Sequence, residues 1–345
     1  MHTDIWFNAL ALRPGGSGVQ TYIRELLSAL ADNRSLRMTA AVQADAVLEL
    51  PSAVRPDTRP VCAGVRRALQ GMRPPPESPQ VVHGLDVDLP VRSLRAVTVA
   101  TVHDCAVVDV PWAFSANRAR AERLLLARAA RTADAIVTPS AFTASRLAAL
   151  YGRTAIVTAL AAGPWATPPP PEEVERVRAT YSLAGDFVLQ VGTVEPRKLT
   201  GLLVAAAQQA GVPVVLAGMG SAALTGAGVQ GLGHIPAQDL PALYAAATLV
   251  CYLSAYEGFG LPPLEAMACG AAVLASDVPP IPEVLLDAAV LVPNHLPTVT
   301  KALRDTVADR DRLQELRARG IRRAATFSWQ NTAKLTAGVY DRLLS

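Results

Sequence analysis

Short apolar runs alternate with longer helix-forming stretches along all 345 residues of this chain. In the first half, the apolar runs that predict strands are residues 5–10, 38–43, 81–84, 97–102, 135–138 and 156–160. Helices are predicted between them, notably at residues 19–31, 115–131 and 141–150. Because such alternation is typical of a parallel sheet covered by helices, the first half predicts an open α/β domain.

A proline-rich segment separates this set from a second one. Residues 163–171 contain five prolines, four of them consecutive, and such a run stays extended and suits an interdomain linker. Beyond it, a short charged helix is predicted at residues 172–181. The strands that follow are predicted at residues 187–191, 214–217, 229–231, 249–253, 273–275 and 289–292. Helices are predicted at residues 201–210, 240–246, 297–319 and 329–344. The chain is expected to form two α/β domains with a ligand cleft beyond the carboxyl ends of the strands.

Composition excludes several other classes of protein. Hydrophobic residues make up 51% and charged residues 18% of the chain, which permits a large core and argues against disorder. A formal net charge of +3, with scattered arginines, does not favour nucleic-acid binding. No signal peptide is recognisable, and no apolar run reaches the roughly 18 residues that span a membrane. A cytoplasmic location is expected, with the inner face of the membrane left open. Reduced, mostly buried thiols are expected at Cys62, Cys105, Cys251 and Cys269.

The segment from Glu257 to Glu265 is the most informative motif. It places two carboxylates eight positions apart, around a glycine-rich turn that leads from a predicted strand into a helix beginning with two prolines. A glycine turn at a helix N-terminus binds anions, because free N–H groups and the helix dipole point at the same place. One carboxylate could accept hydrogen bonds from sugar hydroxyls and the other from a ribose. Taken alone, Glu265 in a first helical turn is equally compatible with simple complementation of the helix dipole.

Three further segments place candidate residues at predicted strand ends. Gly15 and Gly16 lie in a loop before the first helix, where the backbone could approach an anionic ligand closely. His103 follows a predicted strand and could contact a sugar hydroxyl or a phosphate. Arg197 and Lys198 follow the first strand of the second set, and two cations there suit a diphosphate. Each has a plain alternative, which is respectively a flexible turn, a structural histidine and a solvated basic turn.

Two other charged segments carry weaker hypotheses. Asp86 and Asp88 are similar to the metal-binding D-x-D of some sugar-nucleotide enzymes, but they stand apart from other carboxylates and are better explained as a helix cap or loop. No metal site is expected, because no Cys/His cluster has zinc-type spacing. Arg66, Arg67 and Arg73 are predicted to form a solvated loop, although they could also meet an anionic acceptor or a membrane surface.

Taken together, these residues resemble the family-4 retaining glycosyltransferases. The resemblance is strongest from residue 187 to residue 293, through the stretch 191–198, the double-glutamate motif and the stretch 270–277. It implies the GT-B fold, in which two Rossmann-like domains face a cleft. On this basis residues 1–168 would form the acceptor-binding domain and residues 169–326 the nucleotide-sugar-binding domain. Residues 327–345 would form a helix that returns to the first domain.

The resemblance also implies roles for individual residues. Arg197 and Lys198 would hold the donor diphosphate, Glu257 would contact the donor sugar, His103 would line the sugar site, and Glu265 would bind the nucleotide ribose. The first four would be the catalytic residues. The other donor-binding residues implied are Gly15, Gly16, Gly192, Gly258, Phe259, Gly260 and Leu261. One departure from the family is Leu199, where similar proteins often have Asn or Gly.

The activity implied is transfer of a hexose, mannose or a related sugar, from a nucleoside-diphosphate sugar to a hydroxyl acceptor. Residues 194–197 are most similar to members that use GDP-mannose, and a GDP- or UDP-sugar is the expected donor. Neither a metal nor a further cofactor is expected. A glycolipid, a polysaccharide or a secondary metabolite would each serve as acceptor. The alternatives are a catalytically idle sugar-nucleotide-binding subunit and a nucleotide-sugar epimerase of the same fold.

Overall fold

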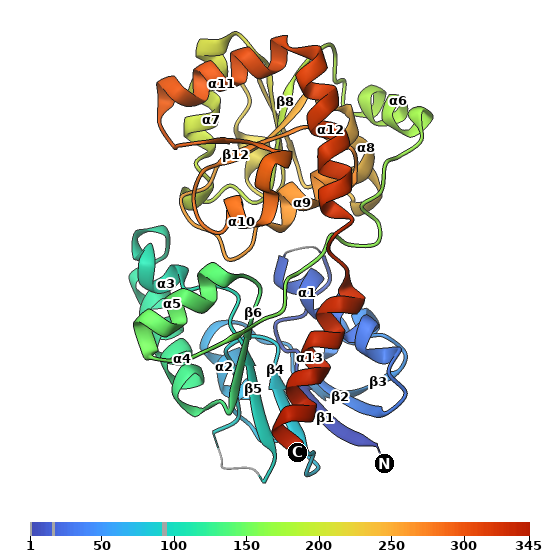
Figure 1. Ribbon diagram of the computed structural model, residues 1–345, viewed down its shortest axis with the longest axis vertical. Coiled ribbons are helices and arrows are strands. Elements are labelled where there is room, and N and C mark those ends of the chain that lie inside the picture. Colours follow the sequence, from blue (N-terminus) through green and yellow to red (C-terminus); the bar gives the residue numbers. More distant parts are fainter. Residues whose placement is uncertain (1, 16–17, 92–94) are drawn as a thin grey trace. The chain divides into compact units, whose positions relative to one another are not determined.

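The computed structural model describes residues 2–15, 18–91 and 95–345, and these form two compact units (Figure 1). Unit 1 comprises Met1–Leu160 with Ser328–Ser345, and unit 2 comprises Ala161–Phe327. Each unit is built on one parallel sheet, so the expected α/β architecture with two parallel sheets is confirmed.

The sheet of unit 1 has the strand order β3-β2-β1-β4-β5-β6-β7. Its strands are β1 (Thr3–Asn8), β2 (Leu36–Gln43), β3 (Val54–Arg59), β4 (Val81–Gly84), β5 (Val97–Thr101), β6 (Ala135–Thr138) and β7 (Ile156–Val157). Strands β2 and β3 follow β1 on one side of the sheet, and strands β5, β6 and β7 follow β4 on the other side. The order therefore reverses between β1 and β4, and such a reversal is where open α/β sheets bind ligands beyond their carboxyl ends.

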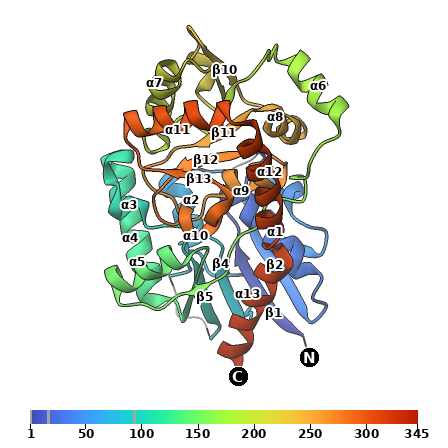
Figure 2. The same ribbon diagram turned by 45° about the horizontal axis from the view of Figure 1, so that its top comes forward.

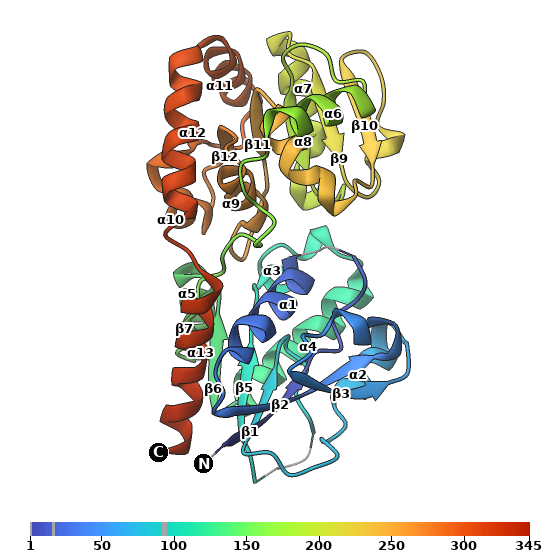
Figure 3. The same cartoon turned by 90° about the vertical axis from the view of Figure 1, so that its right-hand side faces the viewer.

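Helices and 3-10 turns connect these strands. They are α1 (Gly18–Ala31), η1 (Ala44–Glu49), α2 (Gly64–Gly71), α3 (Ala106–Asp109), η2 (Pro111–Ala113), α4 (Ala116–Thr132), α5 (Ala141–Tyr151) and α13 (Trp329–Leu344). The last of them, α13, begins at Ser328, whose side chain accepts the N–H of Asn331 as an N-cap. It packs against α1 within unit 1 (Figure 3). Unit 1 is therefore completed by the last helix of the chain.

Two elements of unit 1 differ from the sequence-based expectation. Strand β3 was not predicted, because Pro56 and three charged side chains obscure its alternation; a proline is tolerated there because β3 is an edge strand. The segment carrying Arg66 and Arg67 is the helix α2, not a loop. Its first residue, Gly64, has a φ of 54°, and its N-cap, Ala63, makes no side-chain capping bond. The usual sequence signals of a helix start are therefore missing here.

The sheet of unit 2 has the strand order β10-β9-β8-β11-β12-β13. Its strands are β8 (Val188–Val191), β9 (Val214–Ala217), β10 (Val229–Gly233), β11 (Leu249–Tyr252), β12 (Val273–Ser276) and β13 (Val290–Val292). Every residue of β9, β11 and β12 is buried, as expected of parallel strands covered on both faces. Here the strand order reverses between β8 and β11.

The helices of unit 2 pack mainly in pairs. They are α6 (Pro171–Thr180), η3 (Pro196–Lys198), α7 (Thr200–Ala210), η4 (Ser221–Ala223), η5 (Ala237–Asp239), α8 (Leu240–Ala246), α9 (Leu261–Ala268), α10 (Ile281–Leu285), η6 (Leu286–Ala288), α11 (Leu296–Ala308) and α12 (Arg310–Ala324). Helices α7 and α11 lie side by side (Figures 1 and 2). The single helix predicted at residues 297–319 is in fact two, α11 and α12. They separate at Asp309, whose side chain accepts the N–H of Arg312 and caps α12.

Two further expectations concern membranes and thiols. Within residues 2–15, 18–91 and 95–345, no helix combines the length and the apolar character needed to cross a membrane. All four cysteines are free; Cys105, Cys251 and Cys269 are buried and Cys62 is partly exposed. The predicted thiols are therefore present, with one of them within reach of solvent.

Candidate functional site

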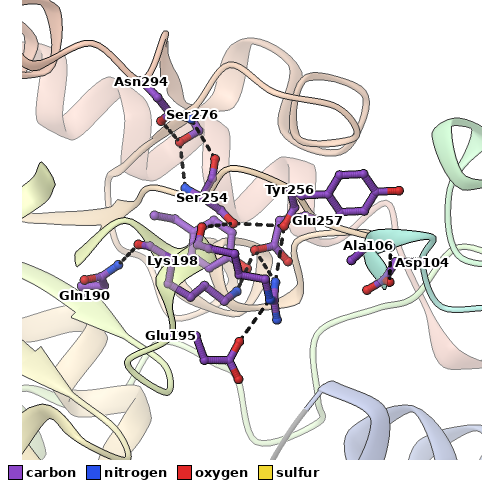
Figure 4. Close-up of polar contacts among 12 residues, drawn as sticks. Asp104, Ala106, Gln190, Glu195, Lys198, Ser254, Tyr256, Glu257, Ser276 and Asn294 are labelled. Atoms are coloured by element: carbon purple, nitrogen blue, oxygen red, sulfur yellow. Dashed lines mark hydrogen bonds and ion pairs between the residues drawn. The ribbon is translucent and has the colours of Figure 1, made fainter. Parts of the chain in front are cut away.

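The predicted cations and one predicted carboxylate of unit 2 meet where its strand order reverses. Strand β8 leads through a short turn into η3, which carries Arg197 and Lys198. Strand β11 ends at Tyr252 and is followed by Glu257. Because β8 and β11 are neighbouring parallel strands, their carboxyl ends bring these side chains together (Figure 4).

Glu257 lies between the two cations. Its Oε1 accepts from Nζ of Lys198 at 2.7 Å and from Nη1 of Arg197 at 3.1 Å. Lys198 also donates to the Tyr252 hydroxyl at 2.5 Å and sits 4.5 Å from the centre of that ring. Arg197 donates from Nε to Glu195 at 3.1 Å. Two cations are thus held within reach of one carboxylate oxygen.

Burial and charge act against each other in this group. Burial raises the pKa of Glu257, but Lys198 and Arg197 outweigh it and bring the pKa down to about 2, so this carboxylate stays ionised. Burial also lowers the pKa of Lys198 from its ordinary value, and Glu257 opposes that shift. Since Glu257 is only 7% exposed, the charges are poorly solvated, and an arriving anion would be strongly attracted to the two cations.

Glu265 is buried with no such compensation. It is 8% exposed, and no partner for its carboxylate is found in the part of the chain that the structure describes. Burial alone raises its pKa to about 7. The sequence placed Glu265 in the first turn of a helix, but α9 begins at Leu261, so Glu265 lies in the second turn. Complementation of the helix dipole therefore does not explain it, because that effect fades beyond the first turn.

The turn before α9 requires glycine for steric reasons. Gly260 is the N-cap of α9 with a φ of 99°, and a Cβ there would lie 2.6 Å from Cδ1 of Ile281. Pro262 and Pro263 have no N–H, so the first turn of α9 offers N–H groups only at Leu261 and Leu264, and Gly260 places no side chain in front of them. Phe259, also a predicted donor-binding residue, is 5% exposed and packs edge-on against Phe327 at 5.8 Å. Its side chain thus belongs to the core of unit 2.

The turn after β8 contains a second close approach. Gly192 has a φ of 144°, and its carbonyl oxygen would lie 2.2 Å from a Cβ added to Gly218.

Leu199, the departure from the family noted above, has a φ of 47° and forms the N-cap of α7. Asn and Gly tolerate this left-handed conformation better than Leu does. The structure thus explains physically why those residues are common at this position.

A set of hydrogen bonds that the sequence did not reveal supports the Arg197–Lys198 turn. Ser254 Oγ lies 3.1 Å from the carbonyl oxygens of both Arg197 and Tyr256. The N–H of Ser254 donates to Ser276 Oγ at 2.9 Å, and Asn294 accepts from Ser276 and donates to the carbonyl of Ser254. Figure 4 shows the chain from Asn294 through Ser276 to Ser254. Its members follow or end β11, β12 and β13, so only knowledge of strand adjacency could have identified them.

Gln190 holds the same turn from the other side. Its amide nitrogen donates to the carbonyl of Lys198 at 2.9 Å (Figure 4). The backbone of the turn is therefore fixed by side chains from both β8 and the end of β11, which limits the movement of the two cations.

In unit 1, His103 and Gly15 lie beyond strand ends, as predicted. His103 follows β5, and its Nε2 lies 3.0 Å from the carbonyl of Leu85. Because a carbonyl only accepts, Nε2 carries the hydrogen and Nδ1 is left as an acceptor when the ring is neutral. Gly15 has a φ of 104°, and Gly16 lies outside the described residues. Asp86 and Asp88 lie in a loop after β4 and flank Arg67, and no metal-type cluster of His, Cys, Asp or Glu occurs among the residues described.

Comparison with known proteins identifies this arrangement. Residues 183–325 match the family described as "Glycosyl transferases group 1" and residues 16–159 match "Glycosyltransferase Family 4". The O-antigen chain mannosyltransferase B of Escherichia coli is 34% identical over 285 residues, which cover 76% of this chain and 74% of that protein. The serotype-specific mannosyltransferase WbdA of Escherichia coli is also 34% identical, but the match covers 50% of this chain and only 24% of that longer protein.

Solved structures agree at the level of the fold. Sucrose-phosphate synthase from Thermosynechococcus elongatus has a TM-score of 0.79 at 20% identity, with 99% of both chains covered. Anabaena HepE, in complex with UDP and glucose, has a TM-score of 0.74 at 17% identity, with 99% of this chain and 100% of that chain covered. The two parallel α/β sheets thus define a GT-B-type glycosyltransferase fold. The chain belongs to glycosyltransferase family 4, an enzyme family of hexosyltransferase class that uses nucleotide-sugar donors.

Proposed function

We propose that this enzyme transfers mannose, or a closely related hexose, from a nucleoside-diphosphate sugar to a hydroxyl group, with retention at the anomeric carbon and without a metal. The observation that carries the proposal is the group formed by Glu257, Lys198 and Arg197, together with the buried Glu265, whose carboxylate has no partner among the described residues. Two cations fit a diphosphate, and a carboxylate without a partner fits a ribose hydroxyl.

The proposed reaction uses these groups as follows. The bond between the anomeric carbon and the diphosphate breaks, and charge develops on the departing diphosphate beside Arg197 and Lys198. The acceptor oxygen bonds to the same face of the anomeric carbon, and its proton passes to a diphosphate oxygen. Preorganised cations stabilise the departing charge without reorganising during the reaction. Glu257, once the diphosphate shares its cations, is free to accept hydrogen bonds from the donor sugar.

The choice of mannose rests on sequence similarity. The O-antigen chain mannosyltransferase B of Escherichia coli covers most of this chain, and residues 194–197 are most similar to family members that use GDP-mannose. GDP-mannose is therefore the first donor to test, and UDP-glucose the second. We further assign donor binding to residues 169–326 and acceptor binding to residues 1–168, with His103 lining the sugar site.

Thermal unfolding in the presence of UDP, GDP, ADP or TDP tests the donor site. A ligand at 100 times its dissociation constant adds about 2.7 kcal/mol to the free energy of unfolding, enough to raise Tm by a few degrees. A rise in Tm with GDP alone supports the proposal as stated. A rise in Tm with UDP alone would keep the donor site and change the expected donor to a UDP-sugar. No rise with any of them would contradict the donor site.

Glu257→Gln should separate binding from turnover. Removing the negative charge leaves Lys198 and Arg197 without their carboxylate, so nucleoside-diphosphate affinity is expected to stay the same or rise. Turnover should fall by roughly 10²–10³, the range observed when one preorganised polar group is removed. Calorimetric titration with the nucleotide and release of nucleoside diphosphate from the donor measure the two effects. A loss of affinity with unchanged turnover would contradict the role of Glu257.

The remaining parts of the proposal have simple tests. Activity should survive EDTA, and complete loss on chelation would overturn the metal-independent mechanism.

Peripheral membrane contact would use α2, where Val65 and Leu69 are 69% and 58% exposed beside the exposed Arg66. Co-sedimentation with anionic vesicles but not with neutral ones would support that contact, because arginine side chains are attracted to negatively charged lipid head groups.

A further inference from the structure

A buried chain of hydrogen bonds crosses unit 1 from its last helix to its sheet. The Tyr340 hydroxyl of α13 lies 2.7 Å from Nδ1 of His83, and Nε2 of His83 lies 2.9 Å from Oγ1 of Thr101. The Tyr22 hydroxyl of α1 lies 2.8 Å from the same Oγ1. All four side chains are at most 1% exposed. The chain therefore links α13, β4, β5 and α1 with no contribution from solvent.

The imidazole at the centre of this chain is uncharged. Burial, with a smaller contribution from nearby His103, lowers the pKa of His83 to about 3. A neutral ring donates from one nitrogen and accepts at the other. Since both nitrogens have partners, the hydroxyls on either side are oriented by the ring, and loss of one member leaves another buried group unsatisfied.

The chain reaches His103 by two routes. The Tyr22 ring meets the His103 ring edge-on, with 4.8 Å between centroids and 82° between planes. His103 Nε2 donates to the carbonyl of Leu85 at 3.0 Å, and Leu85 lies two residues after His83 in the chain. The ring of His103 is thus held on one side by a tyrosine anchored to Thr101, and on the other by the backbone that carries His83.

We infer that His83 is a positioning residue, which transmits the docking of α13 on unit 1 to the orientation of the His103 ring. The inference rests on the proposed function, in which His103 lines the sugar site. It makes the helix that closes unit 1 part of the machinery that sets turnover, although Tyr340 does not itself touch His103.

The experiment uses variants that change a single polar atom of the chain. Thr101→Val and Tyr340→Phe each remove one hydroxyl and keep the shape, and Thr101→Ser restores the hydroxyl. The matched control is Thr336→Val in α13, because Thr336 is also fully buried but, within the described ranges, its hydroxyl bonds only to the carbonyl of Thr332 in its own helix. The four variants and the parent are compared with His103→Ala.

Three measurements are made on each protein. Nuclear magnetic resonance of ¹⁵N-labelled histidine reports the ring environment of His103 independently of activity. Release of nucleoside diphosphate from GDP-mannose and from UDP-glucose reports turnover. Titration with GDP and UDP reports affinity for the nucleotide.

Support consists of shifted His103 ring signals in Thr101→Val and Tyr340→Phe, with turnover lower by roughly ten- to hundredfold and nucleotide affinity unchanged. Such a fall is expected because a displacement of about 1 Å at a reacting centre costs up to about a hundredfold. Thr101→Ser should recover most of the turnover, and Thr336→Val should leave both the signals and the turnover at the parent values.

Unchanged His103 signals in Thr101→Val, or a loss of turnover no larger than in Thr336→Val, would overturn the inference. If His103→Ala lowers turnover while Thr101→Val does not, the positioning role fails and the proposed function stands. Unchanged turnover in His103→Ala would instead contradict the role proposed for His103, and the positioning role would fail with it.

Discussion

At the scale of the residue, Glu265 shows how burial can prepare a group for a ligand at the cost of stability. Its folded pKa of about 7 lies above the ordinary value of 4.5. The folded state therefore binds more protons than the unfolded state between these values, and the free energy of unfolding falls as pH rises through this window. Above about pH 7 the full effect, on the order of 3 kcal/mol, destabilises the protein.

Replacing Glu265 with Gln should remove this penalty and the ligand contact together. At pH 8 the variant is expected to have a higher Tm than the parent, whereas at pH 4 the two should melt alike. Its affinity for the nucleoside diphosphate should fall, because an amide is a weaker acceptor for a ribose hydroxyl than a carboxylate. Calorimetric melting at both pH values and titration with the nucleotide check this. Equal nucleotide affinity in the variant and the parent would contradict the ribose assignment.

Asn294 tests whether the turn that carries Arg197 and Lys198 must be held in place. Asn294→Ala removes the bonds to Ser276 and to the carbonyl of Ser254, with an expected loss of stability of about 1 kcal/mol. Turnover should fall by more than the nucleotide affinity does, because the turn can still reach the phosphates but no longer holds one geometry. Kinetics and urea unfolding measure the two.

Gln209→Ala is the control for this prediction. Gln209 also carries a side-chain amide in unit 2, and it accepts from Thr300 at 3.2 Å, at the end of α7 that is remote from the turn. Similar losses of turnover in the two variants would show that Asn294 has no specific role.

At the scale of the element, the sequence was informative where a local pattern carries the structure. Residues 249–253 predicted a strand and residues 257–265 a turn and a helix, and β11 and α9 are found there. It was less informative where distant parts meet. Ser254 and Asn294 have no local signature, and only the adjacency of β11, β12 and β13 brings them together. His83 is an ordinary strand residue in the sequence, and its partners are 18 and 257 positions away.

The start of α9 provides the prediction at this scale. Gly260→Ala should destabilise unit 2 and weaken nucleotide binding, because a left-handed non-glycine residue costs roughly 1–2 kcal/mol and the added Cβ meets Ile281. Gly201→Ala is the opposite control. Nothing lies within 4 Å of a Cβ at that position in α7, so this change should be neutral or stabilise by about 0.5–1 kcal/mol. Melting with and without GDP distinguishes the two, and equal effects would contradict the steric argument.

At the scale of the whole molecule, unit 1 is assembled from two separate parts of the chain. Its last part, Ser328–Ser345, supplies Trp329, Val339 and Tyr340 to the core. Each fully buried large apolar side chain contributes about 1.5–3 kcal/mol. The helix α13 is therefore expected to be indispensable to unit 1 while leaving the contacts within unit 2 intact.

A chain ending at Phe327 should accordingly melt in two separate steps. The first, from unit 1, is expected well below the Tm of the parent, since its core is uncovered and His83 loses Tyr340. The second, from unit 2, should keep its response to the nucleoside diphosphate. Differential scanning calorimetry with and without nucleotide resolves the two steps. A single transition at the parent temperature would contradict the assignment of α13 to unit 1.

The interrupted sequence of unit 1 also sets an order of events on the ribosome. Domains usually fold from the N-terminus as they are synthesised, at about 5–20 residues per second. Here the intervening segment 161–327 occupies the ribosome for roughly ten to thirty seconds at that speed. Unit 2 can fold during this interval, but unit 1 has to wait for its final helix with the apolar face of α1 uncovered. The segment of unit 1 that precedes unit 2 is thus completed after unit 2, and it is the part that nascent-chain chaperones would be expected to meet.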